Sequence, residues 1–305
     1  MSGHVVALLG ATASGKTAAA VEVARRMPVE VVSADSRQLR REMRIGTAAP
    51  TDDELAAVRH HLVGAVAPDA PWTLADFFEG ALGAIEEIQA RGSVPLLIGG
   101  SGQYVWALLE GWEVPHVPPD PALRARLASD VAEHGLEALH ARLAALDPAS
   151  ADRIDVHNER RIVRALEIID ATGEAVPPLV RRGPAFEWEA IGVAWSRGAL
   201  HERADARVDC MYRDGLIDET RALVGRYGRE FEALRSIGYA DALRVLDGEL
   251  DEPTAIEHTK TETHRLIRMQ ATWFRADDDR IDWHDGADIE ALADAVVAAA
   301  RAPVR

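Results

Sequence analysis

The chain has 305 residues, of which 48% are hydrophobic, so it is long enough for a large core and for two domains. Its formal net charge of −16 argues against broad nonspecific affinity for nucleic acid but does not exclude a local basic groove. A single cysteine, Cys210, excludes an internal disulfide and a cysteine-rich metal site, and it favours the reducing cytoplasm. We find no signal sequence and no apolar run of transmembrane length, and we expect no membrane association.

Residues 10–17, GATASGKT, match the phosphate-binding pattern G-x-x-x-x-G-K-[ST]. An apolar run precedes the motif and a helix-forming run follows it, which is the strand–turn–helix context that the pattern requires. Glycines let successive backbone N–H groups point inward, and the helix N-terminus and Lys16 add positive charge. We therefore predict a phosphate-binding loop in which the Thr17 hydroxyl reaches Mg2+, formed by Gly10, Ala11, Thr12, Ala13, Ser14, Gly15, Lys16 and Thr17.

Two further predicted strands end in polar side chains. Residues 29–35 indicate a buried strand that ends at Asp35, and residues 94–98 indicate another that is followed by a turn with Ser101. Side chains at the carboxyl ends of parallel strands line the ligand crevice of an open α/β sheet. Asp35 is therefore a candidate base or metal ligand, with a loop cap as the alternative, and Ser101 faces the same crevice. Because residues 94–98 end without a carboxylate, an ordinary ATPase is disfavoured.

The middle of the chain is predicted to be a helical insertion. Proline-rich residues 115–121 indicate a domain boundary, and leucines recur at helical spacing from there to about residue 173. Arg160 and Arg164 fall on one helical face, where ion pairs with acidic neighbours such as Glu167 are the alternative to ligand contact.

After the insertion, the chain is predicted to return to the sheet. Residues 190–195 indicate a strand, and a long helix through Leu223 then places Arg203 and Arg207 on one face. A loop at residues 234–239, further helices, a last strand at residues 281–283 and a closing helix complete the prediction. We expect an α/β fold with a P-loop NTPase-like parallel sheet core (residues 1–118 and 190–305) and a helical insertion domain (residues 119–189).

Seven motifs occur in order between residue 5 and about residue 275: GATASGKT, ADSRQ, RIGTAAP, PLLIGGSGQY, NERRIVRALEI, RSIGY and QATWFR. Together they resemble the tRNA dimethylallyltransferase family, also called the tRNA isopentenyltransferase or IPP transferase family. The resemblance implies an enzyme that transfers a dimethylallyl group from dimethylallyl diphosphate to the N6 amine of the adenosine 3′-adjacent to the tRNA anticodon, releasing diphosphate. It also implies Mg2+ as cofactor, and we expect a cytoplasmic monomer whose partner is the tRNA anticodon stem-loop.

The resemblance and the chemistry of this reaction together suggest roles for individual residues. Asp35 is the expected base, oriented by a hydrogen bond with Ser101, and Lys16 is the third expected catalytic residue. Arg203 and Arg207 are expected to bind the diphosphate beside the phosphate-binding loop, because neutralising the leaving group promotes its departure. The expected tRNA contacts are Asp35, Ser36, Arg37, Gln38, Ser101, Arg124, Arg160, Arg161, Arg164, Arg235, Gly238 and Tyr239.

The chain departs from the family pattern at several positions. It has Ala11 in place of proline, Arg40 in place of tyrosine, Ala49 in place of lysine and Ser101 in place of threonine, and residues 264–269 carry less positive charge. Three other functions remain open. An adenylate isopentenyltransferase acting on a free nucleotide is disfavoured by the full helical insertion. A P-loop small-molecule kinase using ATP needs an arginine lid and a second acidic metal ligand, which we do not find. A nonenzymatic nucleotide-binding module does not explain Asp35 and the paired arginines.

Overall fold

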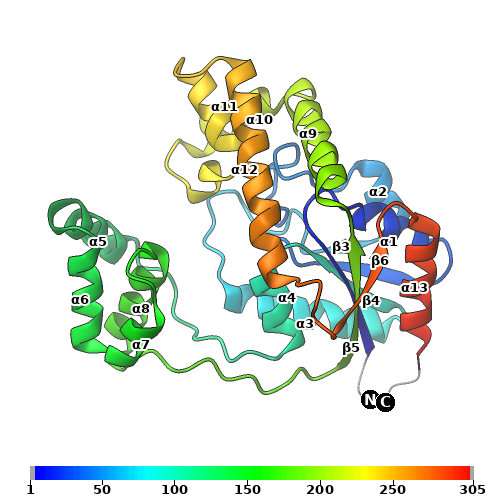
Figure 1. Cartoon of the computed structure of the whole chain (residues 1–305), viewed down its shortest axis with the longest axis horizontal. Coiled ribbons are helices and arrows are strands. Elements are labelled where there is room, and N and C mark those ends of the chain that lie inside the picture. The colour runs from blue at the N-terminus through cyan, green and yellow to red at the C-terminus, as the bar shows by residue number, and fades with distance from the viewer. Residues whose placement is uncertain (1–3, 303–305) are drawn as a thin grey trace. The chain divides into compact units, whose positions relative to one another are not determined.

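A parallel β-sheet lies at the centre of the structure, a computed structural model that describes residues 4–302 (Figure 1). Its six strands follow the order β3-β2-β4-β1-β5-β6, and each neighbouring pair is parallel. Consecutive side chains of β1, β2 and β4 are buried, which requires that both faces of the sheet are covered. This confirms the predicted α/β fold. The strands are β1 His4–Leu9, β2 Val29–Ser33, β3 His60–His61, β4 Val94–Gly99, β5 Glu187–Ala194 and β6 Ile281–Asp285.

Helices pack against this sheet and beyond the carboxyl ends of its strands. Ala20 and Val23 of α1 share a buried cluster with Val296 of α13 and with Val6 and Leu8 of β1. The helix α9 follows β5 directly, and α10, α11 and α12 lie beside it (Figure 1). The helices that flank the sheet are α1 Lys16–Ala24, α2 Asp52–Ala57, α3 Leu74–Ala90, α4 Gly102–Leu109, α9 Arg197–Arg213, α10 Leu216–Tyr227, the 3-10 helix Glu232–Arg235, α11 Tyr239–Leu246, α12 Glu252–Trp273 and α13 Ile289–Arg301.

The chain divides into two compact units, one of Met1–Trp72, Asp76–Gly111 and Gly183–Arg305, the other of Thr73–Ala75 and Trp112–Arg182. The second unit contains α5 Pro121–His134, α6 Leu136–Leu146, α7 Pro148–Arg153 and α8 Glu159–Thr172, which pack around leucines at helical spacing. Proline-rich residues 115–121 belong to this unit and do not mark its boundary. The chain pairs with itself before the prolines, where the Glu113 N–H donates to Val180 O at 3.0 Å.

The long helix predicted to run through Leu223 is wrong, because the structure has two helices there. Gly215 takes a left-handed φ of 102° between α9 and α10, and the Asp214 N–H closes the end of α9 on Cys210 O at 2.8 Å. Glycine adopts this conformation without the steric cost that a side chain imposes. Among residues 4–302, no helix is long and apolar enough to cross a membrane.

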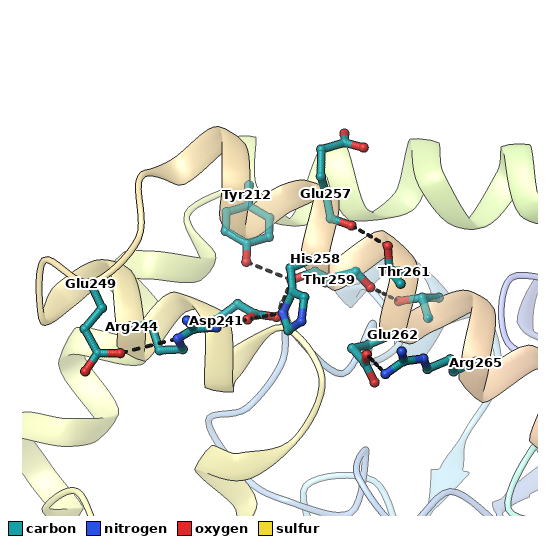
Figure 2. A network of polar contacts seen from close by, with 11 residues as sticks. Tyr212, Asp241, Arg244, Glu249, Glu257, His258, Thr259, Thr261, Glu262 and Arg265 are labelled. Carbon is teal, nitrogen blue, oxygen red and sulfur yellow. Dashed lines mark hydrogen bonds and ion pairs between the residues drawn. The ribbon is translucent and has the colours of Figure 1, made fainter.

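A buried polar network joins α9, α11 and α12 (Figure 2). Asp241 of α11 is 3% exposed, and its Oδ2 accepts a hydrogen bond from Thr259 Oγ1 at 3.1 Å, while its Oδ1 lies 2.7 Å from His258 Nδ1. Tyr212 OH of α9 hydrogen-bonds Thr259 Oγ1 at 2.9 Å. Since buried polar groups are stable only when they are hydrogen-bonded, this network fixes the position of α12 against its neighbours.

Candidate active site

A cavity of about 810 Å3 lies at the carboxyl ends of β1, β2 and β4. Its lining combines the phosphate-binding loop with Asp35 and Gln38 after β2, and with Arg203 and Arg207 of α9. The loop at residues 44–54, which contains the RIGTAAP motif, forms another wall. This is the location at which open α/β sheets bind their ligands.

The phosphate-binding loop has the geometry of an anion cradle. Ala13 and Gly15 adopt left-handed φ values of 63° and 98°, and α1 begins at Lys16. The backbone N–H groups of Ala13, Gly15, Lys16 and Thr17 have no hydrogen-bond partner within residues 4–302. Unpaired N–H groups at a helix N-terminus favour a bound anion, and a phosphate group would satisfy several of them at once.

Lys16 folds back onto the loop. Its Nζ donates to Ala11 O at 2.7 Å and to Gly10 O at 3.0 Å. Burial and the charge of Arg207 lower the pKa of Lys16 to about 7, against the opposing influence of Asp35. The ammonium is therefore destabilised by its surroundings, and a negatively charged ligand beside it would reverse that effect.

Asp35 uses one carboxylate oxygen to fold its own loop and leaves the other for the cavity. Its Oδ1 accepts hydrogen bonds from the backbone N–H groups of Arg37 at 2.8 Å and Gln38 at 3.2 Å. This is an Asx-turn, the loop-capping role that was the alternative for this residue. Oδ2 accepts no hydrogen bond from any residue between His4 and Ala302. A residue in this state is both rigidly oriented and able to accept a proton.

The predicted hydrogen bond between Ser101 and Asp35 is wrong in this structure. Ser101 Oγ instead accepts the Ser36 N–H at 3.2 Å and lies 3.5 Å from Ser36 Oγ. The Asx-turn explains the difference, because it directs the Asp35 carboxylate towards the residues that follow it and leaves Ser36 as the neighbour of β4. Ser101 therefore supports the Asp35 loop through its backbone.

Arg203 and Arg207 both contact the phosphate-binding loop from α9. Arg203 Nε donates to Ala13 O at 2.9 Å, and its guanidinium lies 4.4 Å above the Trp195 ring. Arg207 Nη1 donates to Thr12 Oγ1 at 3.4 Å. Burial and the charge of Arg203 lower the pKa of Arg207. Two like charges held this close indicate a site that is incomplete without an anion.

Comparison with known proteins places the chain in a family. The model for the family described as IPP transferase matches residues 38–277, and a model described as isopentenyl transferase matches residues 3–66. The chain belongs to the IPP transferase family. The resemblance seen in the seven motifs is thereby confirmed.

Relatives in the IPP transferase family match nearly the whole chain. The tRNA dimethylallyltransferase of Chloroflexus aurantiacus is 47% identical over 274 residues, which cover 89% of this chain and 93% of that protein. The tRNA dimethylallyltransferase of Salinispora arenicola is 45% identical over 299 residues and covers 97% of this chain and 86% of its own length. The crystal structure of the tRNA isopentenylpyrophosphate transferase from Bacillus halodurans is similar with a TM-score of 0.71 and 35% identity, and covers 98% of this chain and 97% of that one.

Several residues expected to contact tRNA have structural contacts instead. Tyr239 is fully buried, and its hydroxyl donates to Glu219, so its side chain is not accessible to a ligand. Gln38 Nε2 donates to Ala48 O at 2.9 Å and thereby ties the Asp35 loop to the RIGTAAP loop. Gly238, which has a φ of 84°, immediately precedes α11, whereas Arg235 is exposed.

In the helical unit, Arg124 and Arg164 point towards a buried carboxylate. Arg124 forms two hydrogen bonds with Glu167, from Nε at 2.6 Å and from Nη2 at 3.0 Å, and Arg164 donates to Val117 O at 2.8 Å. Burial raises the pKa of Glu167, but Arg124 and a backbone N–H outweigh this and keep the pKa below its usual value. The ion-pair alternative is therefore confirmed for Arg164. Arg160 and Arg161 lie exposed in the first turn of α8.

Three positioning contacts of this IPP transferase were not predicted from its sequence. Glu219 of α10 accepts the backbone N–H groups of Arg44, Ile45 and Gly46 at 3.0 to 3.3 Å and so holds the RIGTAAP loop. Trp195 Nε1 donates to Ser14 O at 2.9 Å, and Gln270 of α12 contacts the same phosphate-binding loop. No local pattern marks Glu219, whereas Gln270 occurs in the QATWFR motif.

One departure from the family pattern has a structural explanation. Arg40, which replaces tyrosine, donates from Nη1 to Ala67 O at 3.2 Å and to Ala70 O. Burial lowers the pKa of this arginine. Arg40 therefore joins two loops, and its charge is not presented to a ligand.

Proposed function

We propose that this IPP transferase transfers a dimethylallyl group from dimethylallyl diphosphate to the N6 amine of the adenosine 3′-adjacent to the tRNA anticodon. The observation that carries the proposal is the single cavity that joins an anion cradle to the free Asp35 carboxylate oxygen. An anion cradle suits the diphosphate leaving group, and a fixed carboxylate suits removal of a proton from a weakly basic amine. Named tRNA dimethylallyltransferases match the chain over most of their length.

The leaving group is stabilised by positive charge that is already in place. The unpaired N–H groups of the phosphate-binding loop, Lys16 and the guanidinium groups of Arg203 and Arg207 converge on one end of the cavity. As the bond between dimethylallyl C1 and the bridging oxygen breaks, negative charge develops on the diphosphate. Donors that are fixed before the reaction stabilise this charge without reorganisation.

The proton of the amine goes to Asp35. The N6 nitrogen forms a bond to C1 as the diphosphate departs, and Asp35 Oδ2 accepts a proton from this nitrogen. The Asx-turn holds the carboxylate still during this step, because Oδ1 is already bonded to two backbone N–H groups. A positioned base of this kind contributes about 10²–10⁴-fold to rate.

The donor set of the cavity fits Mg2+ that is held mainly by the substrate. No group of three or more His, Cys, Asp and Glu side chains capable of holding a metal occurs within the described part of the chain. Thr17, whose hydroxyl has no protein partner there, lines the cavity beside Lys16. Mg2+ commonly binds one or two protein oxygens together with substrate phosphates and water. Thr17 would provide the protein ligand, and the ion would neutralise the diphosphate oxygens.

The helical unit is proposed to bind the anticodon stem-loop. Its exposed Arg160 and Arg161 project from the N-terminal turn of α8, where the helix dipole adds to their positive charge. Phosphates of a folded RNA are bound by such groups without regard to sequence. Arg124 and Arg164 have a different task, since their ion pairs with Glu167 hold α5 and α8 together.

The proposal is tested by the acceptor that receives the label. The protein is incubated with Mg2+, labelled dimethylallyl diphosphate and either total tRNA or AMP, and ATP is supplied in a separate reaction. We expect label in tRNA alone. Label in AMP would identify an adenylate isopentenyltransferase, and phosphate transfer from ATP would identify a kinase. Either result would contradict the proposed function.

A further inference from the structure

Gln270 connects two parts of the active site that are far apart in the sequence. Its side chain is 7% exposed, and its Oε1 accepts the Thr12 N–H of the phosphate-binding loop at 2.8 Å. Its Nε2 donates to Gly100 O, in the turn between β4 and α4, at 3.0 Å. Both polar atoms of the buried amide are therefore satisfied, each by a backbone atom at the cavity wall.

The bond to Thr12 lies at a strained position of the loop. Ala13, the next residue, adopts a left-handed φ of 63°, which is unfavourable for a residue with a side chain. Such a conformation persists only where the surrounding structure fixes it. Gln270 fixes the peptide before Ala13, and Ile267, one turn earlier on α12, packs against the Ala13 side chain.

Gly100 leaves the space that the amide needs. A Cβ atom at this position would lie 2.3 Å from Gln270 Nε2, far inside contact distance. The next residue, Ser101, bonds Ser36 beside Asp35. Gln270 thus joins the loop that cradles phosphate to the turn that supports the proposed base.

The helix that carries Gln270 is anchored at its other end by the network of Figure 2. Thr259, which bonds Asp241 and Tyr212, lies about three turns before Gln270 on the same buried face of α12. A helix fixed in this way presents the amide at a defined distance from the two backbone atoms.

We propose that Gln270 is a positioning residue that locks the phosphate-binding loop to the β4–α4 turn, so that the diphosphate cradle and the acceptor side of the cavity keep a fixed register. The proposal deepens the proposed function and rests on it for its consequence in catalysis. Its first consequence, a preformed anion cradle, does not depend on which group is transferred.

Gln270→Glu tests the proposal because its effect depends on pH. The new carboxylate still accepts the Thr12 N–H, but as an anion it faces Gly100 O without a proton to donate. When it is protonated it donates to Gly100 O as the amide does, and burial among uncharged groups raises the pKa of such a carboxyl. Gln270→Met removes both bonds at every pH.

The measurement is the dissociation constant for inorganic pyrophosphate with Mg2+, obtained by calorimetry at about pH 6 and about pH 8.5 and divided by the wild-type value at each pH. We expect Gln270→Met to bind about 10-fold more weakly than wild type at both pH values, which corresponds to the loss of one or two net hydrogen bonds. Gln270→Glu should bind about 10-fold more weakly at the higher pH and within about 2-fold of wild type at the lower pH. Turnover with tRNA should follow the same pattern.

A matched control comes from the same face of the same helix. Thr259→Val removes a buried hydrogen bond of α12 without touching the loop, and should lower the melting temperature while leaving the pyrophosphate ratio near one at both pH values. Wild-type affinity in Gln270→Met overturns the proposal, as does a Gln270→Glu ratio that does not change with pH, or failure of both Gln270 variants to fold by circular dichroism. Absence of dimethylallyl transfer by the wild type would reject the proposed function alone, because the pyrophosphate ratios still decide the role of Gln270.

Discussion

Binding of a diphosphate should cause Lys16 to take up a proton. In the free protein, burial and Arg207 lower the pKa of Lys16 to about 7, so the side chain is roughly 3% protonated at about pH 8.5. A bound diphosphate places two or more negative charges within contact distance of Nζ, which raises this pKa towards or above its ordinary value. At this pH the site therefore gains close to one proton on binding, or about 1 per ligand. The uptake should decline as the pH falls through 7, because free Lys16 is then already charged.

Calorimetry measures this uptake directly. The observed binding enthalpy for pyrophosphate is compared in buffers with different ionisation enthalpies, and the slope gives the number of protons exchanged. The ligand exchanges protons too, so the informative quantity is the difference between wild type and Lys16→Met. We expect a difference of about one proton at about pH 8.5 and a much smaller one at about pH 6. Equal proton exchange in both proteins at the higher pH would refute the reasoning about Lys16.

Three further predictions concern the other parts of the account. Asp35→Ala should reduce single-turnover rates by about 10²–10⁴-fold with pyrophosphate and tRNA affinities nearly unchanged, and a near-normal rate would mean that Asp35 is only a loop cap. Arg207→Ala should weaken pyrophosphate binding and leave tRNA affinity little changed, whereas Arg161→Ala should weaken tRNA binding and reduce its salt dependence by about one phosphate contact; identical effects on both ligands would disprove this division. Glu167→Gln should lower the free energy of unfolding by about 2 kcal/mol, and this loss should largely disappear in an Arg124→Met background; equal losses in both backgrounds would show that the ion pair does not stabilise the protein.

The core elements of the fold could be predicted from the sequence because their signals are local. The phosphate-binding motif fixes β1, its turn and α1 within about twenty residues, and continuous apolar runs mark β2 and β4. The break at Gly215 was missed because apolar residues on both sides continue the helical pattern across it. Likewise, the sequence places Ser101 and Asp35 at one sheet edge, but the choice of Ser36 over Asp35 as partner depends on the turn that Asp35 itself forms.

The positioning residues could not be predicted, because they act on backbone atoms of distant segments. Glu219 binds N–H groups about 175 positions away, and Gln270 binds Thr12 across 258 positions. Backbone partners leave no trace in the identity of the residues that provide them. Tyr239 shows the opposite error, since a residue within a family motif was expected to meet RNA and instead supports Glu219 from the core.

The central claim is that this cavity alkylates one defined adenosine amine, and the most direct test is the location of the product. An anticodon stem-loop RNA is incubated with the protein, Mg2+ and dimethylallyl diphosphate, then digested and analysed by mass spectrometry. The account predicts a mass increase of one dimethylallyl group on the adenosine 3′-adjacent to the anticodon, located on N6, and none with Asp35→Ala in a single-turnover period. A product on another nucleotide, on the ribose or on a phosphate, or equal product with Asp35→Ala, would contradict it.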